Sequence, residues 1–303
     1  MKTTRRQFLK ASAIGVGGAL FTPSLSLRAA PDTGEKIGAY DSVTLGRTGI
    51  KTSRVSMGTG VSGGMRESNH TRMGAENARK LIREIYEHGV RAFDLADLYG
   101  THPLVPPALE GVPRDQYQLF SKIWWRPGGI PEKERPNADV VVERFLKELK
   151  TDYLDLVLLH CVETPDWPKV LSEQMEILAK LKSKGAIRAH GVSCHSLPAL
   201  EAVIDEPWVD SVHSRINPYG LQMDGPAEKV APVLKRIRAK GKGVVGMKII
   251  GEGRLRNDEE KKNHSIRYAW VEGLVDMVTV GFEKTSELED FANRLKTVPK
   301  AAA

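Results

Sequence analysis

Short apolar segments alternate with amphipathic segments along residues 40–300, and this alternation constrains the fold more strongly than any other feature of the chain. Apolar segments of four to seven residues are typical of strands buried on both faces of a parallel sheet. No Pro-, Gly- or Ser-rich linker interrupts the series. The predicted strands are 54–58, 90–94, 117–122, 154–160, 190–193, 211–215, 243–247 and 277–280.

Apolar residues recur at helical spacing between these strands. One such stripe runs through 78–85 and ends at Gly89, and similar stripes run through 140–149 and 170–181. Eight strand–helix units in about 250 residues are typical of a (β/α)8 barrel, in which eight parallel strands form one closed sheet. We therefore expect a single barrel domain.

A doubly wound parallel sheet is the second interpretation. Such a sheet binds a dinucleotide through a glycine-rich turn that joins its first strand to a helix. Residues 58–64 are rich in glycine, but the helix pattern that this turn requires does not accompany them. The barrel is therefore the preferred fold.

The first thirty residues differ in character from the rest of the chain. The segment 4–10, Thr-Arg-Arg-Gln-Phe-Leu-Lys, resembles a twin-arginine export signal, and an apolar run follows at 11–21. That run is too short to cross a bilayer as a permanent helix, so we expect no stable membrane span. The resemblance implies a signal peptide at 1–30, export of the folded protein by the bacterial twin-arginine machinery, and a periplasmic domain at 31–303. A basic amphipathic N-terminal helix is the alternative.

The net charge of the chain is +7, with 45 Lys and Arg residues against 38 Asp and Glu residues. Five basic residues and no acidic ones lie in 1–30, which leaves 40 against 38, or +2, for 31–303. A nearly neutral domain has no basic surface for a phosphate backbone, so we expect no nucleic-acid partner. The two cysteines, Cys161 and Cys194, are too few for a disulfide framework, and we expect free thiols.

The chemistry of a (β/α)8 barrel lies where its strands end, at the C-terminal face. This rule selects Asp94, Lys122 and His160 at three consecutive strand ends, and Tyr99 in the loop after Asp94. A phenol has a pKa near 10, and we expect the Lys122 ammonium to lower it and so prepare Tyr99 for proton transfer. Asp94 would hold Lys122, His160 would bond a substrate oxygen, and Trp124 would form an apolar wall. Taken singly, each polar residue has an ordinary structural explanation.

The segments that carry these residues are similar to those of the aldo-keto reductase family. They are 92–100, with an acid and a tyrosine five residues apart, 121–124, 154–160, 191–193, 45–49 and 57–60. The resemblance covers residues 40–296 and implies an NAD(P)H-dependent oxidoreductase that reduces small aldehydes and ketones to alcohols. It further implies that Tyr99 protonates the carbonyl oxygen, that Asp94 and Lys122 tune Tyr99, and that His160 orients the carbonyl group.

The same resemblance implies a cofactor site formed by Gly58, Thr59, Ser193, Cys194, His213, Met247, Lys248, Gly281 and Lys284. At several positions the chain departs from the usual residues of the family. Cys194 stands in place of an Asn, His213 in place of a Gln, and Met247 in place of an aromatic residue. Glu287 stands where an Arg usually binds a 2′-phosphate, and Glu283 adds a carboxylate, which suits a ribose hydroxyl better. We expect NADP(H) as the cofactor, with NAD(H) second.

Two other functions remain open. A metal-dependent barrel hydrolase is suggested by ligand-type residues near the ends of three strands, namely His160, Cys161, Cys194, His195 and His213. Because neighbouring residues of a strand point to opposite faces, His160 and Cys161 are not expected to share one ion, and we expect no metal site. An exported nucleotide-binding or sensing protein with little catalysis is suggested by the changes at Cys194, Met247 and Glu287. Such a protein would not need all four catalytic residues.

Overall fold

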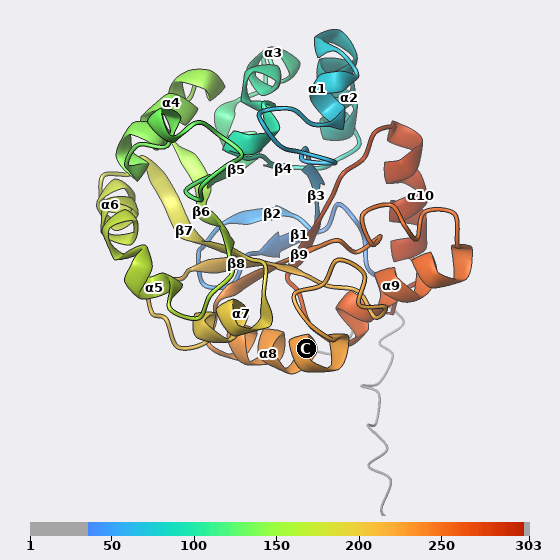
Figure 1. The fold of residues 1–303 in the computed structure, drawn as a ribbon. Helices are drawn as coiled ribbons and strands as arrows, with labels where there is room; N and C mark the ends of the chain where they lie inside the picture. The colour runs from blue at the N-terminus through green and yellow to red at the C-terminus, as the bar shows by residue number, and fades with distance from the viewer. Residues whose placement is uncertain (1–35, 300–303) are drawn as a thin grey trace, which may run out of the picture. The chain divides into compact units, whose positions relative to one another are not determined.

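Eight parallel strands close into a barrel in the computed structural model, which describes residues 36–299 (Figure 1). The order around the barrel is β10-β3-β4-β5-β6-β7-β8-β9, so each strand pairs with its neighbour in the chain and β10 closes the ring on β3. This arrangement confirms the predicted (β/α)8 barrel. The strands are β3 (Val55–Gly58), β4 (Ala92–Asp94), β5 (Gln118–Ile123), β6 (Leu154–Val162), β7 (Ile187–Cys194), β8 (Ser211–Arg215), β9 (Gly243–Met247) and β10 (Met277–Val280).

The strand bounds follow the sequence pattern closely. The last three strands have the predicted bounds. β7 begins at Ile187, three residues before its predicted start, and β6 continues two residues past its predicted end at His160. The extension of β6 places Cys161 and Val162 inside the sheet, next to the end of β7.

Side chains alternate between the inside of the barrel and the layer beneath the helices, because successive residues of a strand point to opposite faces. On β6, Leu156 and Leu158 belong to the cluster inside the barrel. Val157 and Leu159 belong to the larger cluster beneath the helices. The same alternation makes His160 the next inward residue, at the C-terminal end of the column. Apolar side chains therefore fill the barrel up to the point where polar ones begin.

Amphipathic helices surround the barrel, as Figure 1 shows. Helix α2 (Ala75–Glu87) buries the stripe predicted within 78–85 and is followed by Gly89, whose φ of 109° is readily adopted by glycine. The other long helices are α4 (Ala138–Leu149), α6 (Ser172–Ser183), α7 (Leu197–Val203), α8 (Ala227–Ala239), α9 (Glu259–Val271) and α10 (Thr285–Leu295). Shorter pieces are α1 (Asn69–Arg72), α3 (Val105–Ala108), α5 (Trp167–Val170), η1 (Asp97–Tyr99), η2 (His102–Leu104), η3 (Arg114–Gln116) and η4 (Glu132–Glu134).

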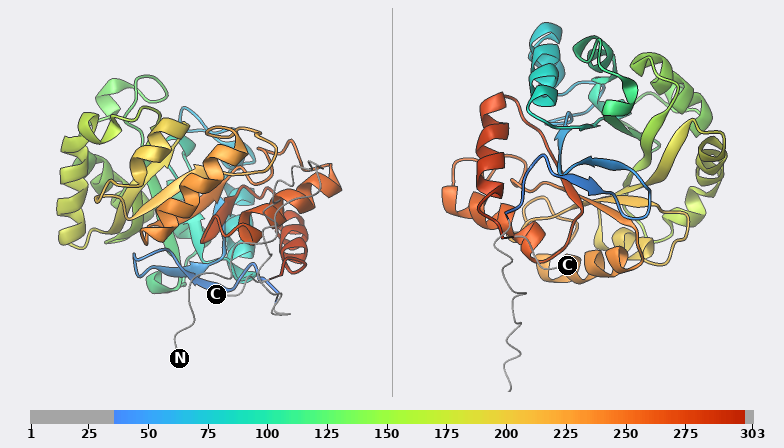
Figure 2. Two further views of the ribbon diagram at one scale, coloured as in Figure 1. Left: turned by 90° about the horizontal axis from the view of Figure 1, so that it is seen from below. Right: turned by 180° about the vertical axis from the view of Figure 1, so that it is seen from behind.

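A hairpin that the sequence pattern did not predict covers the N-terminal end of the barrel. Its strands are β1 (Ser42–Thr44) and β2 (Lys51–Ser53), which pair antiparallel. Leu45 and Ile50, next to these strands, are fully buried in the cluster inside the barrel. Figure 2 (right) shows the hairpin lying across this end. The hairpin leaves the opposite, C-terminal mouth as the open end.

The described residues contain no helix that is both long and apolar enough to cross a membrane. The predicted signal peptide, residues 1–30, lies outside the described residues. The barrel accounts for residues 36–299 of the predicted domain at 31–303.

Candidate active site

The four predicted catalytic residues lie together at the C-terminal mouth of the barrel. Asp94 ends β4, Lys122 and His160 lie near the ends of β5 and β6, and Tyr99 ends the 3₁₀ turn after β4. Lys122 Nζ donates to Asp94 Oδ1 over 2.6 Å and to the Leu95 carbonyl over 2.9 Å. The Tyr99 hydroxyl lies 3.5 Å from Nε2 of His160, and Lys122 Nζ lies 5.2 Å from the centroid of the Tyr99 ring. A phenol, an imidazole and an ion pair therefore share one small volume.

Three glycines allow the Tyr99 ring to occupy this position. A Cβ at Gly60 would overlap the ring, and a Cβ at Gly63 would come within 2.8 Å of it. Gly100 follows Tyr99 with a φ of +67°, and a Cβ there would overlap the Arg66 carbonyl. Glycine is the residue that adopts such a backbone without strain. The glycine-rich segment after β3 is thus explained by packing against Tyr99.

A buried polar cluster lies beneath the mouth. Lys122 and His213 have no exposed surface, and Asp94 is 3% exposed. Burial by itself would raise the pKa of Asp94, but the positive charge of Lys122 and the contact with His213 outweigh burial, and the pKa lies well below its ordinary value. Asp94 is therefore held as a carboxylate.

His213 binds Asp94 through one of its ring nitrogens. Its Nε2 lies 3.2 Å from Asp94 Oδ1. Burial lowers the pKa of His213, so its imidazole is neutral and donates the Nε2 proton to the carboxylate. Nδ1 of His213 has no hydrogen-bond partner within residues 36–299, and the predicted role of His213 in the cofactor site stays a prediction.

The pKa of Tyr99 also differs from the prediction. Burial first, and then the Asp94 carboxylate, raise the pKa of Tyr99 well above 10.0. The Lys122 ammonium does not lower it, because Asp94 neutralises that ammonium at 2.6 Å. Burial lowers the pKa of His160 well below its usual range, and the charge of Lys122 lowers it further. Tyr99 and His160 therefore face each other as a neutral phenol and a neutral imidazole.

Two tryptophans contact His160, one at its ring and one at its backbone carbonyl. The Trp124 ring stands edge-on to the His160 ring, with 5.5 Å between the centroids, and its Nε1 donates to the Gly128 carbonyl over 2.6 Å. Trp125 Nε1 donates to the backbone carbonyl of His160 over 2.7 Å. Trp124 thus lies where the sequence analysis placed an apolar wall, next to the candidate catalytic histidine.

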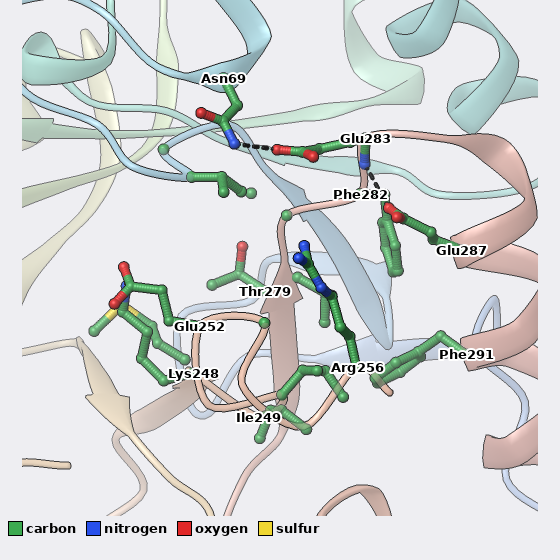
Figure 3. Close-up of a pocket in the computed structure, with 18 of the residues that line it drawn as sticks. Asn69, Lys248, Ile249, Glu252, Arg256, Thr279, Phe282, Glu283, Glu287 and Phe291 are labelled. Carbon is green, nitrogen blue, oxygen red and sulfur yellow. Dashed lines mark hydrogen bonds and ion pairs between the residues drawn. The ribbon is translucent and has the colours of Figure 1, made fainter. Parts of the chain in front are cut away.

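A cavity of about 490 Å³ extends from Tyr99 to the N-terminal end of α10. Figure 3 shows ten of its lining residues with labels, among them Lys248, Arg256 and Glu287. The walls of the cavity are the ends of β3 and β10, the loop after β9, and the first turns of α10. Ligand sites typically measure about 300–1,000 Å³, so this space has the size of a site for a large organic molecule. Four predicted cofactor residues line it, namely Gly58, Met247, Lys248 and Gly281.

Two further predicted cofactor residues use their hydroxyl groups within the protein. Thr59 Oγ1 donates to the backbone carbonyl of Asp94 over 3.0 Å. Ser193 Oγ accepts from the backbone N–H of Cys161 over 3.0 Å. Neither side chain lines the cavity. Both hold the strand ends that carry the candidate catalytic residues.

The remaining two predicted cofactor residues also lie away from the cavity lining. Cys194 has no exposed surface and packs in the apolar cluster beneath the helices. Lys284 is exposed and precedes the first turn of α10. A strand-end pattern identifies these positions along the chain, but it does not determine the direction of each side chain.

Arg256 lines the cavity, although no sequence pattern selected it. It comes from the loop after β9, and its guanidinium group points into the space (Figure 3). Lys248 Nζ is paired with Glu252 over 2.7 Å, and Lys262 Nζ with Asp290 over 3.2 Å. Within residues 36–299 the Arg256 side chain has no such partner, so it is available to an anion. A glycine-rich, basic run at 251–256 was the signal that could have identified it.

The two carboxylates expected to oppose a 2′-phosphate are engaged with neighbouring groups. Asn69 Nδ2 donates to Glu283 Oε1, and the backbone N–H of Glu283 donates to Glu287 Oε2 over 2.8 Å (Figure 3). Asn69 was not selected from the sequence. These hydrogen bonds partly offset the negative charge of Glu283 and Glu287.

The model of the Aldo/keto reductase family matches residues 54–303. The chain is 30% identical over 143 residues to a methylglyoxal reductase of Salmonella typhimurium, which covers 46% of this chain and 51% of that protein. The match thus spans about half the length of this curated relative. The chain is 27% identical over 230 residues to D-arabinose 1-dehydrogenase of Saccharomyces cerevisiae, which covers 71% of this chain and 67% of that protein.

A solved structure has the same fold. It is an aldo/keto reductase of Klebsiella pneumoniae in complex with NADP and acetate, with a TM-score of 0.61 and 21% sequence identity. The superposed region covers 84% of this chain and 90% of that chain. At this identity the likeness shows the barrel fold, in agreement with the strand order.

Proposed function

Because this chain belongs to the aldo/keto reductase family, we propose that it reduces small aldehydes and ketones to alcohols with NADPH, and that Tyr99 donates the proton. The observation that carries the proposal is the group of four polar side chains at the mouth, with the Tyr99 hydroxyl 3.5 Å from His160 Nε2 and the Lys122–Asp94 ion pair below it. The relatives support this class of reaction, since methylglyoxal and sugars contain small carbonyl groups.

The residues of the cavity support a nicotinamide dinucleotide as the cofactor. The space reaches from Tyr99 to α10, and Gly58 and Gly281 add no side chain to its lining. The N-terminal end of α10 carries a partial positive charge that favours a phosphate, although Glu287 already accepts one of the backbone donors there. When bound, the reduced cofactor supplies a hydride to the carbonyl carbon.

The protein's own residues would bind the carbonyl group and provide the proton. The neutral His160 imidazole would donate a hydrogen bond to the carbonyl oxygen, while Trp124 excludes water from one side. Tyr99 would pass its hydroxyl proton to the same oxygen. Its raised pKa keeps that proton in place until negative charge develops on the oxygen. Asp94 would hold Lys122 beneath Tyr99, and the ammonium over the face of the ring would keep the Tyr99 side chain in position.

We favour NADPH over NADH because of Arg256. A guanidinium group without an anionic partner in the described part of the chain suits the 2′-phosphate, which only NADPH carries. Glu283 and Glu287 oppose a phosphate less than their charges suggest, because Asn69 and a backbone N–H bind them. NADH is the second candidate.

The test is steady-state oxidation of each nucleotide by the full chain with methylglyoxal and with an aromatic aldehyde. We expect turnover that falls by at least about a hundredfold in Tyr99→Phe, since general acid catalysis contributes factors of about 10²–10⁴. Tyr117→Phe, which changes a buried tyrosine outside the mouth, is the matched control. Turnover that Tyr99→Phe leaves intact would exclude Tyr99 as the proton donor.

A nucleotide-binding or sensing protein with little catalysis is the second candidate. The burial of Cys194 in the apolar cluster beneath the helices, away from the cavity, favours it. Tight binding of NADPH without turnover on any carbonyl compound would support this candidate. Turnover lost on Tyr99→Phe would exclude it.

We also infer that the protein is exported to the periplasm by the twin-arginine machinery, on the residues Arg5 and Arg6 and the apolar run that follows. The test is fractionation of a bacterial host that produces the full chain. We expect periplasmic protein, which is lost in the double variant Arg5→Lys and Arg6→Lys. Cytoplasmic protein in both cases would refute the inference.

A further inference from the structure

Three potential metal ligands meet at the mouth of the barrel, beside the candidate active site. They are His160 and Cys161 on β6 and His195, which directly follows β7. One ring nitrogen of each histidine and the Cys161 sulfur all lie within 4.8 Å of one another. The closest pair, Cys161 Sγ and His195 Nε2, is 3.3 Å apart. Both cysteines are free thiols, as predicted.

The backbone of β6 brings His160 and Cys161 to the same side. Cys161 has a φ of +61°, a left-handed conformation that is uncommon for residues other than glycine, and the pairing register with β7 shifts between Leu159 and Val162. Such a bulge cancels the alternation of side chains at this point. The expectation that His160 and Cys161 face opposite ways is wrong for this reason, because their ligand atoms lie within 4.8 Å of each other.

Bonds from the neighbouring strand hold the distorted segment in place. The Cys161 N–H donates to Ser193 Oγ over 3.0 Å, and the His195 N–H donates to the Val162 carbonyl over 2.8 Å. A strained conformation persists only where its surroundings determine it, and such residues cluster at functional sites. The positions of the ligand-type residues are therefore built into the fold.

One imidazole of the cluster has a nitrogen without a partner. Nδ1 of His160 is buried and has no hydrogen-bond partner within residues 36–299. A buried nitrogen without a partner favours any ligand that satisfies it, and imidazole nitrogens are common metal ligands.

The geometry points to a zinc site formed by His160, Cys161 and His195, with a fourth coordination position open toward the mouth. In a tetrahedral site with Zn–N near 2.0 Å and Zn–S near 2.3 Å, the ligand atoms lie about 3.5 Å apart. The Cys161–His195 distance of 3.3 Å fits this value, and the other pairs of ligand atoms, which lie within 4.8 Å of one another, have to close by at most about 1.3 Å. Zinc binding releases the thiol proton of Cys161, and the resulting thiolate offsets one of the two positive charges of the ion.

Zinc in this site would inhibit carbonyl reduction. His160 Nε2 lies 3.5 Å from the Tyr99 hydroxyl, so an ion bound to the same ring would restrain the imidazole that has to bond the carbonyl oxygen. This consequence rests on the proposed function, whereas zinc binding does not.

The first experiment measures binding without any assay of activity. The full chain, prepared without a polyhistidine tag and treated with EDTA, is dialysed against Zn²⁺, and in parallel titrated with Co²⁺ as a spectroscopic substitute. We expect one zinc ion per chain, and a cobalt–thiolate charge-transfer band in the near ultraviolet. Cys161→Ser should abolish that band, and His195→Gln should weaken zinc binding at least tenfold.

Cys194→Ser is the matched control, because Cys194 is a buried cysteine of the neighbouring strand that packs under the helices. It should keep both the stoichiometry and the charge-transfer band. Thermal unfolding in EDTA shows that each variant is folded. Absence of stoichiometric zinc in the unmodified chain, or binding that Cys161→Ser leaves unchanged, would overturn the proposal.

The second experiment separates the site from the reductase activity. We expect zinc to raise the KM for the carbonyl compound at least tenfold in the unmodified chain and to leave Cys161→Ser unaffected. Zinc bound through Cys161 in a chain without turnover would refute the proposed reductase and leave the metal site standing. Carbonyl turnover in a chain that binds no zinc would refute the metal site and leave the proposed reductase standing.

Discussion

Replacing Asp94 by Asn tests whether the buried pair with Lys122 is charged. Asn has nearly the same shape as Asp and keeps an oxygen that accepts from Lys122 Nζ, so the substitution removes the charge and retains the contact. Lys122 has no exposed surface, and its other acceptor is the Leu95 carbonyl at 2.9 Å. The substitution therefore leaves an ammonium group buried without a counter-charge.

The expected loss of stability follows from this environment. Removing one partner of a buried ion pair costs about 3–5 kcal/mol, and the retained hydrogen bond favours the lower end of that range. A domain of this size loses about 2–4 °C of melting temperature per kcal/mol, which predicts a decrease of about 6–12 °C. The depressed pKa of Asp94 gives stability that is complete above the unfolded pKa, near 4, and is lost as the pH falls through the folded pKa. The difference in melting temperature between Asp94→Asn and the unmodified chain should therefore be constant between about pH 5 and 8.

The assay is thermal unfolding of the full chain followed by circular dichroism. Glu87→Gln is the control, since Glu87 forms an exposed pair with Arg83 at 2.8 Å on helix α2. Exposed pairs of this kind contribute about 0.5 kcal/mol or less, so the control should melt within about 2 °C of the unmodified chain. If Asp94→Asn melts no lower than Glu87→Gln, the pair beneath Tyr99 does not carry opposite charges and our account of the site is refuted.

Three further predictions concern the cavity, Tyr99 and the pH dependence of stability. Arg256→Ala should raise the KM for NADPH at least about tenfold and leave that for NADH within about twofold, because it removes a charge-assisted bond of about 1.5–3 kcal/mol to the 2′-phosphate. The exposed Lys284→Ala is the control, and equal effects on both nucleotides would contradict the assignment. Gly60→Ala should lower kcat about a hundredfold, since its Cβ overlaps the Tyr99 ring and displaces the hydroxyl by about 1 Å; an unchanged kcat would show that the ring position is not critical. Burial raises the pKa of Asp224 to about 6. The free energy of unfolding is therefore higher below the unfolded pKa of this group, near 4, and it falls by about 2–3 kcal/mol as the pH rises to about 6. Urea unfolding near pH 4 and near pH 6 measures the loss, and Asp224→Asn should not show it. If the stability of Asp224→Asn and of the unmodified chain falls in parallel with pH, the prediction is contradicted.

The barrel and the four candidate catalytic positions could be predicted because they depend on local rules. The apolar runs and the helical stripes each extend over fewer than about twenty residues, and both periodicities are written directly in the sequence. On β6, every second side chain points into the barrel. His160 therefore lies on the same face as Leu156 and Leu158, at the C-terminal end of the strand. Strand ends in a parallel barrel meet at one mouth, so the convergence of the four residues followed from topology alone.

The state of these residues depends on partners that local rules do not provide. His213 reaches Asp94 across 119 positions of the chain, and Asp94 in turn neutralises Lys122. Each contact changes the pKa of the next group, so Tyr99 has a raised pKa where the sequence suggested a lowered one. Position on a strand was predictable, whereas the pairing of charges required the closed barrel.

The bulge at Cys161 marks the point where the local rule itself breaks. Alternation holds along β6 up to His160 and fails one residue later, where Cys161 takes a φ of +61°. Ser193 and Val162 accept backbone bonds that hold this distortion, and both bonds come from the contact between β6 and β7. Local sequence rules such as strand alternation usually match the fold, and the places where they fail tend to be functional sites. The departure beside His160 brings two imidazoles and a thiol together, and it is the reason to look for zinc at a mouth where we propose that four polar residues carry out carbonyl reduction.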